Sequence, residues 1–163
     1  FKLPPATIEY AVTIAASLAR FYISRGRALG LACSGATMQV LPSDRGGRQI
    51  GKILETLALL RADGQLPLMS LVETQARCLP RGSTSVFITP GTSDKGFRAV
   101  DLLLRRGLRP VVVLINAATF GGGQGSENLA YSLQSIGIPV CQVGYGDDLT
   151  ETLSQVVNRP QWA

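Results

Sequence analysis

The sequence predicts an α/β fold in which helices cover both faces of a doubly wound, mostly parallel sheet with one antiparallel edge strand. Apolar runs of strand length alternate with longer segments whose apolar residues recur at helical spacing. The run at residues 111–115 is apolar throughout, which is typical of a parallel strand covered on both faces. The stretch 83–94 joins a β-branched run to a Pro-Gly turn and a helix start, as at the carboxyl edge of such a sheet, where ligands and partners usually bind.

Length and composition favour one domain spanning residues 1–163, because the chain can form a continuous core but is short for two ordinary domains. The sequence contains no histidine, which removes the usual zinc ligand and the commonest general base. Cys33, Cys78 and Cys141 are odd in number and stand in apolar contexts. We therefore expect reduced, buried thiols and a cytosolic compartment.

The net charge of +5 comes from arginines that are interleaved with carboxylates. A nucleic-acid-binding face would more often show a dense basic stripe with stacking aromatics, so we expect a solvated or protein-facing surface and no nucleic-acid partner. Residues 10–23 are the only candidate membrane stretch; Arg20 interrupts them and they are too short to span a bilayer. No signal peptide is visible, and the absence of an initiator methionine suggests a piece of something longer. The expected location is the cytoplasmic side, with membrane anchoring only through an upstream segment.

In the first half of the chain, a helix is predicted from Pro4 to Gly26, followed by a buried strand at residues 28–33. Residues 37–41 predict an edge strand, antiparallel to its predecessor because the connection at 34–36 is too short for a crossover. An exposed loop at 42–48 precedes an amphipathic helix that starts at residue 45 or 47 and ends near 61. A second helix from about 67 to 78 stops at Pro80.

In the second half, a strand at residues 85–89 is followed by a helix that begins near residue 94 and that Gly107 closes. The apolar strand 111–115 comes next, and a long connection at 116–125 leads to a helix at 126–136. The last strand spans 139–143 and the last helix 148–157. The tail from residue 158 is expected to fray, with Trp162 as the one residue that could dock.

A glycine-rich loop at residues 120–126 lies between a strand and a helix, where phosphate-binding loops occur. It invites a nucleotide-binding interpretation. However, no lysine follows its last glycine as in a P-loop, and the dinucleotide spacing lacks its third glycine. The alternative is a surface loop with Ser126 as the N-cap of the following helix.

Two groups of oxygen-bearing side chains also fall at the predicted carboxyl edge. Asp147 and Asp148 could hold a metal or a ribose, although Asp148 with Glu151 also fits a helix-capping box. Thr89 and Asp94, together with Thr92 and Ser93, offer oxygens suited to magnesium, or else Ser93 or Asp94 caps the next helix. No serine or cysteine has a recognisable base and orienting partner, so the sequence gives no support for nucleophilic catalysis.

Four segments together carry a resemblance to a known family: residues 9–19, residues 26–31, residues 41–50 with the leucine-rich helix that follows, and residues 79–83 before a strand. They resemble the carboxyl-terminal part of the bacterial family called domain of unknown function fifty-eight. This resemblance implies a von Willebrand factor type A-like domain, commonly anchored in a membrane upstream and encoded beside MoxR-type AAA+ ATPases. The implied role is protein interaction or assembly.

The resemblance also implies a metal-ion-dependent adhesion site, which the chain matches only in part. The stretch that holds Asp94 takes the place of the loop after the fourth strand, but the usual Thr-Asp-Gly order is replaced by Thr89-Pro90-Gly91. The first, central strand and its Asp-x-Ser-x-Ser loop are absent. No cofactor is therefore expected, and magnesium could bind only if that loop is present upstream. Either the strands at 28–33 and 85–89 pair directly, or another chain fills the gap between them.

The resulting expectation is a non-catalytic protein-interaction or assembly domain whose partner could be a MoxR-type AAA+ ATPase, with a homodimer as a further arrangement. The competing expectation is a nucleotide- or phosphate-binding enzyme that uses the loop at 121–125. The expected partner surface is formed by loops at the carboxyl edge. Its residues are Thr89, Thr92, Ser93, Asp94, Asn116, Gly122, Gly123, Asp147 and Asp148.

Overall fold

The computed structural model describes residues 3–61, 68–91 and 94–158, and shows the expected mixture of helices and strands. Its strands are β1 (Leu29–Ser34), β2 (Met38–Asp44), β3 (Thr84–Thr89), β4 (Arg109–Ile115) and β5 (Val140–Val143). Its helices are α1 (Leu3–Ser24), α2 (Gly47–Ala58), α3 (Leu68–Ala76), α4 (Asp94–Arg105), the short 3₁₀ helix η1 (Ala117–Phe120), α5 (Glu127–Ser135) and α6 (Leu149–Val157). Each of these elements overlaps a segment for which the sequence predicts the same type of structure, except η1, which forms inside the predicted connection.

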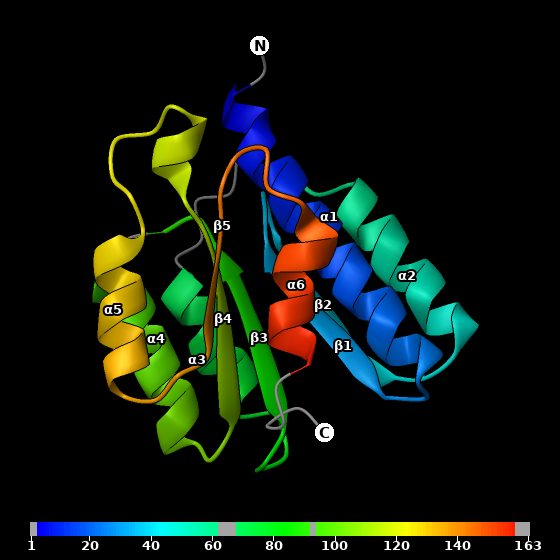
Figure 1. The fold of residues 1–163 in the computed structure, drawn as a ribbon. Coiled ribbons are helices and arrows are strands. Elements are labelled where there is room, and N and C mark those ends of the chain that lie inside the picture. Colours follow the sequence, from blue (N-terminus) through cyan, green and yellow to red (C-terminus); the bar gives the residue numbers. More distant parts are fainter. Residues whose placement is uncertain (1–2, 62–67, 92–93, 159–163) are drawn as a thin grey trace.

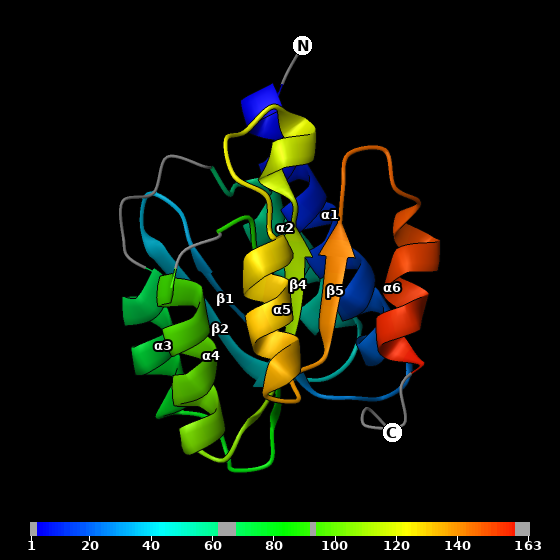
Figure 2. The same cartoon turned by 60° about the vertical axis from the view of Figure 1, so that its left-hand side comes forward.

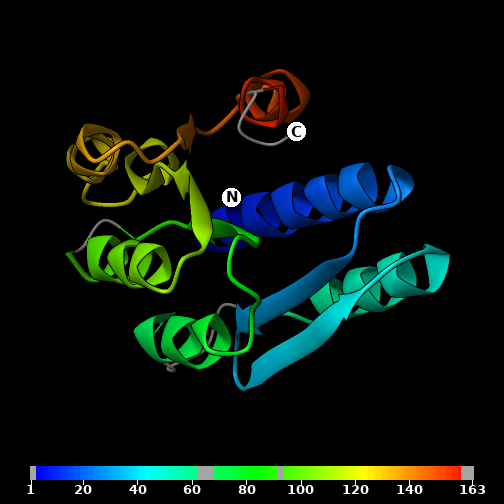
Figure 3. The ribbon, with the colours of Figure 1, turned by 90° about the horizontal axis from the view of Figure 1, so that it is seen from below.

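The elements form three layers (Figure 1). Seen from below in Figure 3, the strands lie in the middle layer, α1, α2 and α6 lie on one side, and α3, α4 and α5 lie on the other. The alternation of strands and helices along the chain leads to this arrangement, because each crossover helix packs its apolar face on the strands. The prediction of an α/β fold with helices on both sides is confirmed.

The strands form two separate sheets, whereas the sequence predicts one continuous sheet. β3, β4 and β5 are parallel in the order β3-β4-β5, and β1 pairs with β2 in an antiparallel hairpin. β1 and β3 are not hydrogen-bonded to each other. Direct pairing of these two strands, one of the two arrangements that the sequence left open, is therefore wrong. The other arrangement, in which another chain lies between them, stays a prediction.

β4 is the central strand of the parallel sheet and separates two apolar clusters. Val112 and Leu114 point into a cluster with α3, α4 and α5, whereas Val111, Val113 and Ile115 point into a cluster with α1 and α6. All five side chains are at most 4% exposed. The strand at residues 111–115 is therefore covered by helices on both faces, as its uninterrupted apolar sequence predicts.

A third cluster joins α1 and α2 to the hairpin. Its buried members are Ala19, Ile23, Ile53 and Leu57. A buried amide supports this unit: Gln49, only 2% exposed, donates hydrogen bonds from Nε2 to the carbonyl oxygens of Leu29 and Pro42, at 2.7 and 3.0 Å. Because buried carbonyl groups need a donor, this side chain fixes the start of α2 against both strands of the hairpin.

Three helices end in the same way, at a glycine with positive φ. Gly26, Gly107 and Gly137 have φ of 76°, 79° and 84° after α1, α4 and α5. In each case the N–H of the residue after the glycine donates to the carbonyl five residues before it, at 3.1 Å. This is the hydrogen bond of a Schellman motif, and it places the helix ends where the glycines predict them.

Some local predictions differ from the structure. β2 continues through Asp44, although residues 42–44 were expected to be loop; Pro42 is accommodated because β2 is an edge strand with an irregular register opposite Leu29 and Leu31. Of the three free thiols, Cys141 is buried and Cys33 is half-buried, but Cys78 is exposed. Trp162 lies outside the described residues. None of the helices in the described ranges combines the length and the apolarity needed to cross a membrane.

Candidate functional site

The carboxyl ends of β3, β4 and β5 lie at the upper end of the molecule in Figure 1, as parallel pairing requires. The segment after β4 carries η1 and the glycine-rich loop, and the segment after β5 leads to α6. The start of α1 reaches the same end of the molecule (Figure 1). The carboxyl edge is therefore built from segments that are distant in the sequence.

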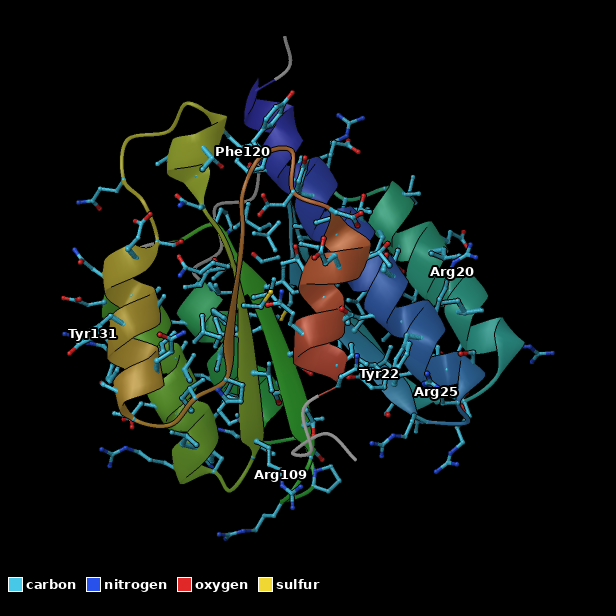
Figure 4. All side chains as sticks on the ribbon, in the orientation of Figure 1. Arg20, Tyr22, Arg25, Arg109, Phe120 and Tyr131 are labelled. Atoms are coloured by element: carbon cyan, nitrogen blue, oxygen red, sulfur yellow. The ribbon has the colours of Figure 1, made fainter. Side chains whose placement is uncertain are left out.

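Three aromatic side chains meet at this edge. The rings of Tyr10 on α1 and Phe120 on η1 contact edge to face with centroids 4.9 Å apart. Tyr145, in the loop after β5, is edge-on to Phe120 at 5.4 Å and stacked near Tyr10 at 6.3 Å. Phe120, labelled near the top of Figure 4, is only 4% exposed, whereas Tyr145 is 60% exposed. The cluster therefore consists of a buried phenylalanine, Phe120, and an exposed tyrosine, Tyr145, that packs against it.

Hydrogen bonds fix the exposed tyrosine in place. The backbone N–H of Tyr145 donates to Thr119 Oγ1 at 2.8 Å, and that hydroxyl donates to the Asn116 carbonyl at 2.7 Å. The N–H of Gly146 donates to the Tyr10 hydroxyl at 2.9 Å. The backbone N–H groups of Tyr145 and Gly146 are therefore both engaged, which holds the chain at Tyr145 in place, while the ring packs on Phe120.

The glycine-rich loop is shaped by its own backbone and by a carboxylate. Gly121 has φ of 88°, and the N–H of Gly122 donates to the Ala117 carbonyl at 2.8 Å, which closes η1. The Glu127 carboxylate occupies the space that a side chain at Gly125 would take, and it accepts a hydrogen bond from Asn116 Nδ2 at 3.0 Å. A negative charge thus lies beside the loop and at the start of α5, where a bound phosphate would need positive potential.

Ser126 does not cap α5 in the way that the sequence predicts. It occupies the N-cap position, but its hydroxyl makes no capping hydrogen bond and instead donates to Gln142 Oε1 on β5 at 3.0 Å. Ser126 is fully buried, so its hydroxyl requires a partner within the protein. The neighbouring strand supplies that partner, and the capping prediction is wrong for this side chain.

The two adjacent aspartates have separate local roles. Asp148 Oδ1 accepts hydrogen bonds from the backbone N–H groups of Thr150 and Glu151, at 2.9 and 3.2 Å, which confirms the part of the predicted capping box in which Asp148 caps α6. Asp147 Oδ2 accepts from the N–H of Gly144 at 2.7 Å and closes the turn after β5. Both residues are exposed, and each carboxylate is held by backbone donors.

The two weak metal candidates, Thr89 and Asp94, have different surroundings. Thr89 is 5% exposed, and its Oγ1 accepts from the N–H of Gly91 at 3.0 Å. Asp94 is exposed in the first turn of α4 and lines an open hollow between α4 and α5, together with Arg98 and Tyr131. Thr92 and Ser93 lie outside the described residues. Over residues 3–61, 68–91 and 94–158, no group of three or more histidine, cysteine or carboxylate side chains is arranged to hold a metal ion.

The charge of the carboxyl edge differs from that of the whole chain. Its two connecting segments, residues 116–127 and 144–151, contain no lysine or arginine, and they carry Glu127, Asp147, Asp148 and Glu151. Asn116, Gly122, Gly123, Asp147 and Asp148, all predicted for the partner surface, lie in these segments. Thr119, Phe120 and Tyr145 lie in the predicted loops 116–126 and 144–148, but sequence reasoning singled out none of them, and it missed Tyr10 on α1. The only local signal was a tyrosine between two glycines directly after a strand.

Comparison of the sequence with models of known protein families and with curated proteins finds no match. The chemistry of the carboxyl edge must therefore be inferred from its own residues. These residues provide the exposed Tyr145, whose ring packs on Phe120 and Tyr10 and is surrounded by carboxylates. They provide no histidine, and their hydroxyl groups at Thr119 and Thr89 are engaged in hydrogen bonds within the protein.

Proposed function

We propose that this protein is a non-catalytic protein-interaction or assembly domain that binds its partner at the carboxyl edge. The observation that carries the proposal is Tyr145, a residue that is 60% exposed and whose ring lies against the buried Phe120. Tyrosines are enriched among the residues that dominate binding energy at protein interfaces, because they bury a large surface and lose little rotamer entropy. A tyrosine whose backbone is held by hydrogen bonds and whose ring already packs on Phe120 loses still less.

The charge around Tyr145 indicates the kind of partner. Asp147, Asp148 and Glu151 follow it within six residues, and Glu127 lies on the other segment of the edge. These carboxylates would favour a partner surface that carries arginine or lysine around an apolar or aromatic contact. The proposed partner is therefore a basic protein surface, not an acidic one and not a nucleic acid.

The finer part of the proposal concerns the family. The resemblance to the domain of unknown function fifty-eight implies a von Willebrand factor type A-like fold and a MoxR-type AAA+ ATPase as partner. The α/β order of the elements and the antiparallel hairpin at one side of the strands support this proposal in its coarse outline. Magnesium binding and membrane anchoring belong to the same proposal only through a segment upstream of residue 1.

The competing nucleotide-binding activity is disfavoured by charge. The Glu127 carboxylate lies beside Gly125, so it would repel an anionic phosphate at the one loop that the sequence offers for it. Thermal unfolding with ATP, GTP, NAD and magnesium tests this point, because a specific ligand raises the melting temperature by mass action. The proposed function predicts no shift with any of them; a shift with one nucleotide would favour the enzyme.

The direct test is binding of a purified MoxR-type ATPase, measured by calorimetry for the wild type and two variants. Tyr145→Ala is expected to weaken binding by roughly tenfold or more, as for an interface hot spot. Tyr131→Ala is the matched control, because Tyr131 is also a tyrosine, is 76% exposed, and lies on α5 at the left of Figure 4, away from Phe120 at the top. Equal affinities for the two variants would contradict the proposed surface. No binding by the wild type would contradict the proposed partner.

A further inference from the structure

Exposed arginines gather at the end of the molecule opposite the carboxyl edge. In Figure 2 the arrows of β4 and β5 point to the upper end, so the segments that lead into these strands lie at the lower end. We call this end the amino edge; its segments are residues 25–28, 44–48, 77–83 and 105–109. Figure 4 shows Arg25 and Arg109 at this end and Phe120 at the other. Apart from Asp44, the charged residues of the amino edge are all exposed arginines: Arg25, Arg27, Arg45, Arg48, Arg77, Arg81, Arg105, Arg106 and Arg109.

Hydrogen bonds between these segments hold the amino edge together. The N–H of Gly82 donates to the Gly107 carbonyl at 2.7 Å, which joins the segments before β3 and β4. Arg45 Nη1 donates to the Gly26 carbonyl at 2.9 Å, which joins the segment after β2 to the segment after α1. Arginines that are distant in the sequence therefore lie at one surface, the end of the molecule that Figure 3 views from below.

Some of these arginine side chains are already held by the fold. The Arg81 guanidinium lies against the backbone of Gly107, with Nε 2.9 Å from the position that a Cβ atom would take there. The Arg25 guanidinium carbon lies 3.9 Å from the centre of the Phe21 ring. Because a free arginine loses rotamer entropy when a partner orders it, side chains held in this way lose less on binding.

The amino edge and the carboxyl edge carry charge of opposite sign. Arg105 is paired with Asp101 one helical turn earlier, at 2.8 Å, which neutralises a part of the positive charge. The remaining arginines leave the amino edge basic. The carboxyl-edge segments at residues 116–127 and 144–151 carry only carboxylates. Each edge is therefore complementary in charge to the other edge of the same protein.

The carboxylates of the carboxyl edge also keep acceptor capacity. The hydrogen bonds described above engage Asp147 Oδ2 and Asp148 Oδ1. The second oxygen of each carboxylate accepts no hydrogen bond from the residues that the structure describes. An arginine from another molecule could therefore donate to either group without breaking the bonds that shape the loop.

From this charge distribution we infer that the protein self-associates head to tail, with the carboxyl edge of one copy bound to the amino edge of the next. The guanidinium group donates in a fork that matches a carboxylate, and it also stacks on aromatic rings. It therefore suits both the carboxylates and the exposed Tyr145, and the chain already shows such stacking in Arg25 on Phe21. The inference rests on the proposed function, because it uses the carboxyl edge as the interaction surface and names a second copy as its basic partner.

The position of the two edges determines the form of the assembly. A symmetric dimer would place edges of like charge against each other, which is unfavourable. The head-to-tail contact instead leaves one carboxyl edge and one amino edge free, so that further copies can add. Since each contact covers Tyr145, self-association competes with any other partner of the carboxyl edge.

Sedimentation velocity over a range of protein concentrations tests the assembly. At about 0.1 M salt, species larger than dimers should appear and grow with concentration, and about 1 M salt should dissociate them because it screens the charges. A protein that stays monomeric at millimolar concentration overturns the inference. A closed dimer that does not grow also overturns it.

A pair of charge-reversed variants tests the amino edge. Arg81→Glu together with Arg106→Glu is expected to weaken self-association by roughly tenfold or more. Arg20→Glu together with Lys52→Glu is the matched control, because it makes the same change in net charge at exposed positions within α1 and α2. The control should associate like the wild type. Equal association of the two double variants overturns the inference.

A mixing experiment tests both edges at once. Tyr145→Ala together with Glu151→Lys blocks the carboxyl edge, and the Arg81→Glu and Arg106→Glu pair blocks the amino edge. Each variant alone should be monomeric, and circular dichroism checks that each is folded. Their mixture should form a dimer with one copy of each variant and nothing larger, because only one intact pair of edges remains. A mixture of the two folded variants that stays monomeric overturns the inference.

Binding to other partners separates this inference from the proposed function. If the ATPase binds in a Tyr145-dependent way but the protein does not self-associate, the inference is wrong and the proposed function stands. Tyr145-dependent self-association without ATPase binding supports the inference and contradicts the proposed partner. If the amino edge binds phosphatidylserine vesicles or DNA and the protein stays monomeric, its partner is another polyanion and the inference is overturned.

Discussion

The backbone N–H of Gly146 donates a hydrogen bond to the Tyr10 hydroxyl at 2.9 Å, although the two residues are 136 positions apart. The contact joins the first helix to the last loop of the carboxyl edge. Together with the ring contact of Tyr10 and Phe120, it places one residue of α1 beneath the exposed Tyr145. The order of the candidate partner surface therefore depends on a side chain that lies outside the surface loops.

Tyr10→Phe tests this dependence. The variant keeps the aromatic contacts and removes the acceptor for Gly146, and it is expected to lower the free energy of unfolding by about 1 kcal/mol, measured by urea denaturation. Amide exchange at Gly146 should become faster while exchange in β4 stays unchanged. Unaltered exchange at Gly146 would show that the hydrogen bond does not order the loop.

Gly122→Ala and Gly123→Ala form a matched pair in the glycine-rich loop. A Cβ atom at Gly122 would lie 2.8 Å from the Ala117 carbonyl oxygen, whereas a Cβ atom at Gly123 would meet nothing within 4 Å. The first substitution is expected to destabilise the protein by about 1 to 3 kcal/mol, because the backbone must shift. The second is expected to be nearly neutral. Equal melting temperatures for the two variants would contradict the described path of the loop.

Gln49→Leu tests the buried amide that holds the hairpin. The substitution keeps an apolar stem but leaves the carbonyl groups of Leu29 and Pro42 without their donor, so we expect a loss of about 2 to 3 kcal/mol in denaturant unfolding. Arg48→Ala, at the exposed neighbouring position, should change stability by no more than about 0.5 kcal/mol. A loss for Gln49→Leu as small as that of the control would contradict the role of the amide.

Stability should fall in alkaline solution because of two partly buried groups. Burial raises the pKa of the Cys33 thiol above its ordinary value of 9.0, and burial also raises the pKa of Tyr22 above 10.0, although Arg27 and Arg25 oppose this second shift. The folded state therefore holds these protons more tightly than the unfolded state. The resulting stabilisation is fully present below the unfolded-state pKa and is lost as pH rises through the folded-state pKa.

Urea unfolding at neutral pH and at successive values above 9.0 measures this loss. Cys33→Ser removes the titrating thiol, so stability of the variant should depend less steeply on pH between the ordinary thiol and phenol values. Tyr22→Phe should flatten the dependence at still higher pH. A Cys33→Ser variant with the wild-type slope would contradict the contribution of this thiol.

The elements that the sequence predicts best are those set by local patterns. The apolar run at residues 111–115 predicts a doubly covered strand, and Gly107 predicts the end of α4, because each depends on the chemistry of neighbouring residues. Asp148 likewise caps α6 through backbone groups two and three residues away. At β2 the same approach fails, since Pro42 indicates a loop but is tolerated at the irregular edge of the hairpin.

The features that the sequence does not predict depend on contacts between distant segments. Ser126 fits an N-cap locally, but Gln142 on β5 takes its hydroxyl. The cluster of Tyr10, Phe120 and Tyr145 has no local pattern, because its members come from three elements. The division into two sheets also cannot be predicted from local patterns. The residue patterns of β1 and β3 are those of strands in either case, whether or not another strand pairs with their free edges.

Helix α1 contributes side chains to two apolar clusters, and the two clusters become complete at different stages of translation. Ala19 and Ile23 pack with Ile53 and Leu57, so residues 3–58 can associate while the ribosome is still synthesising the parallel sheet. Ile14 and Leu18 pack instead with residues of β4, β5 and α6. During translation, the second stripe of α1 therefore stays uncovered until the final third of the chain emerges, and that stripe is where a chaperone would bind the growing polypeptide.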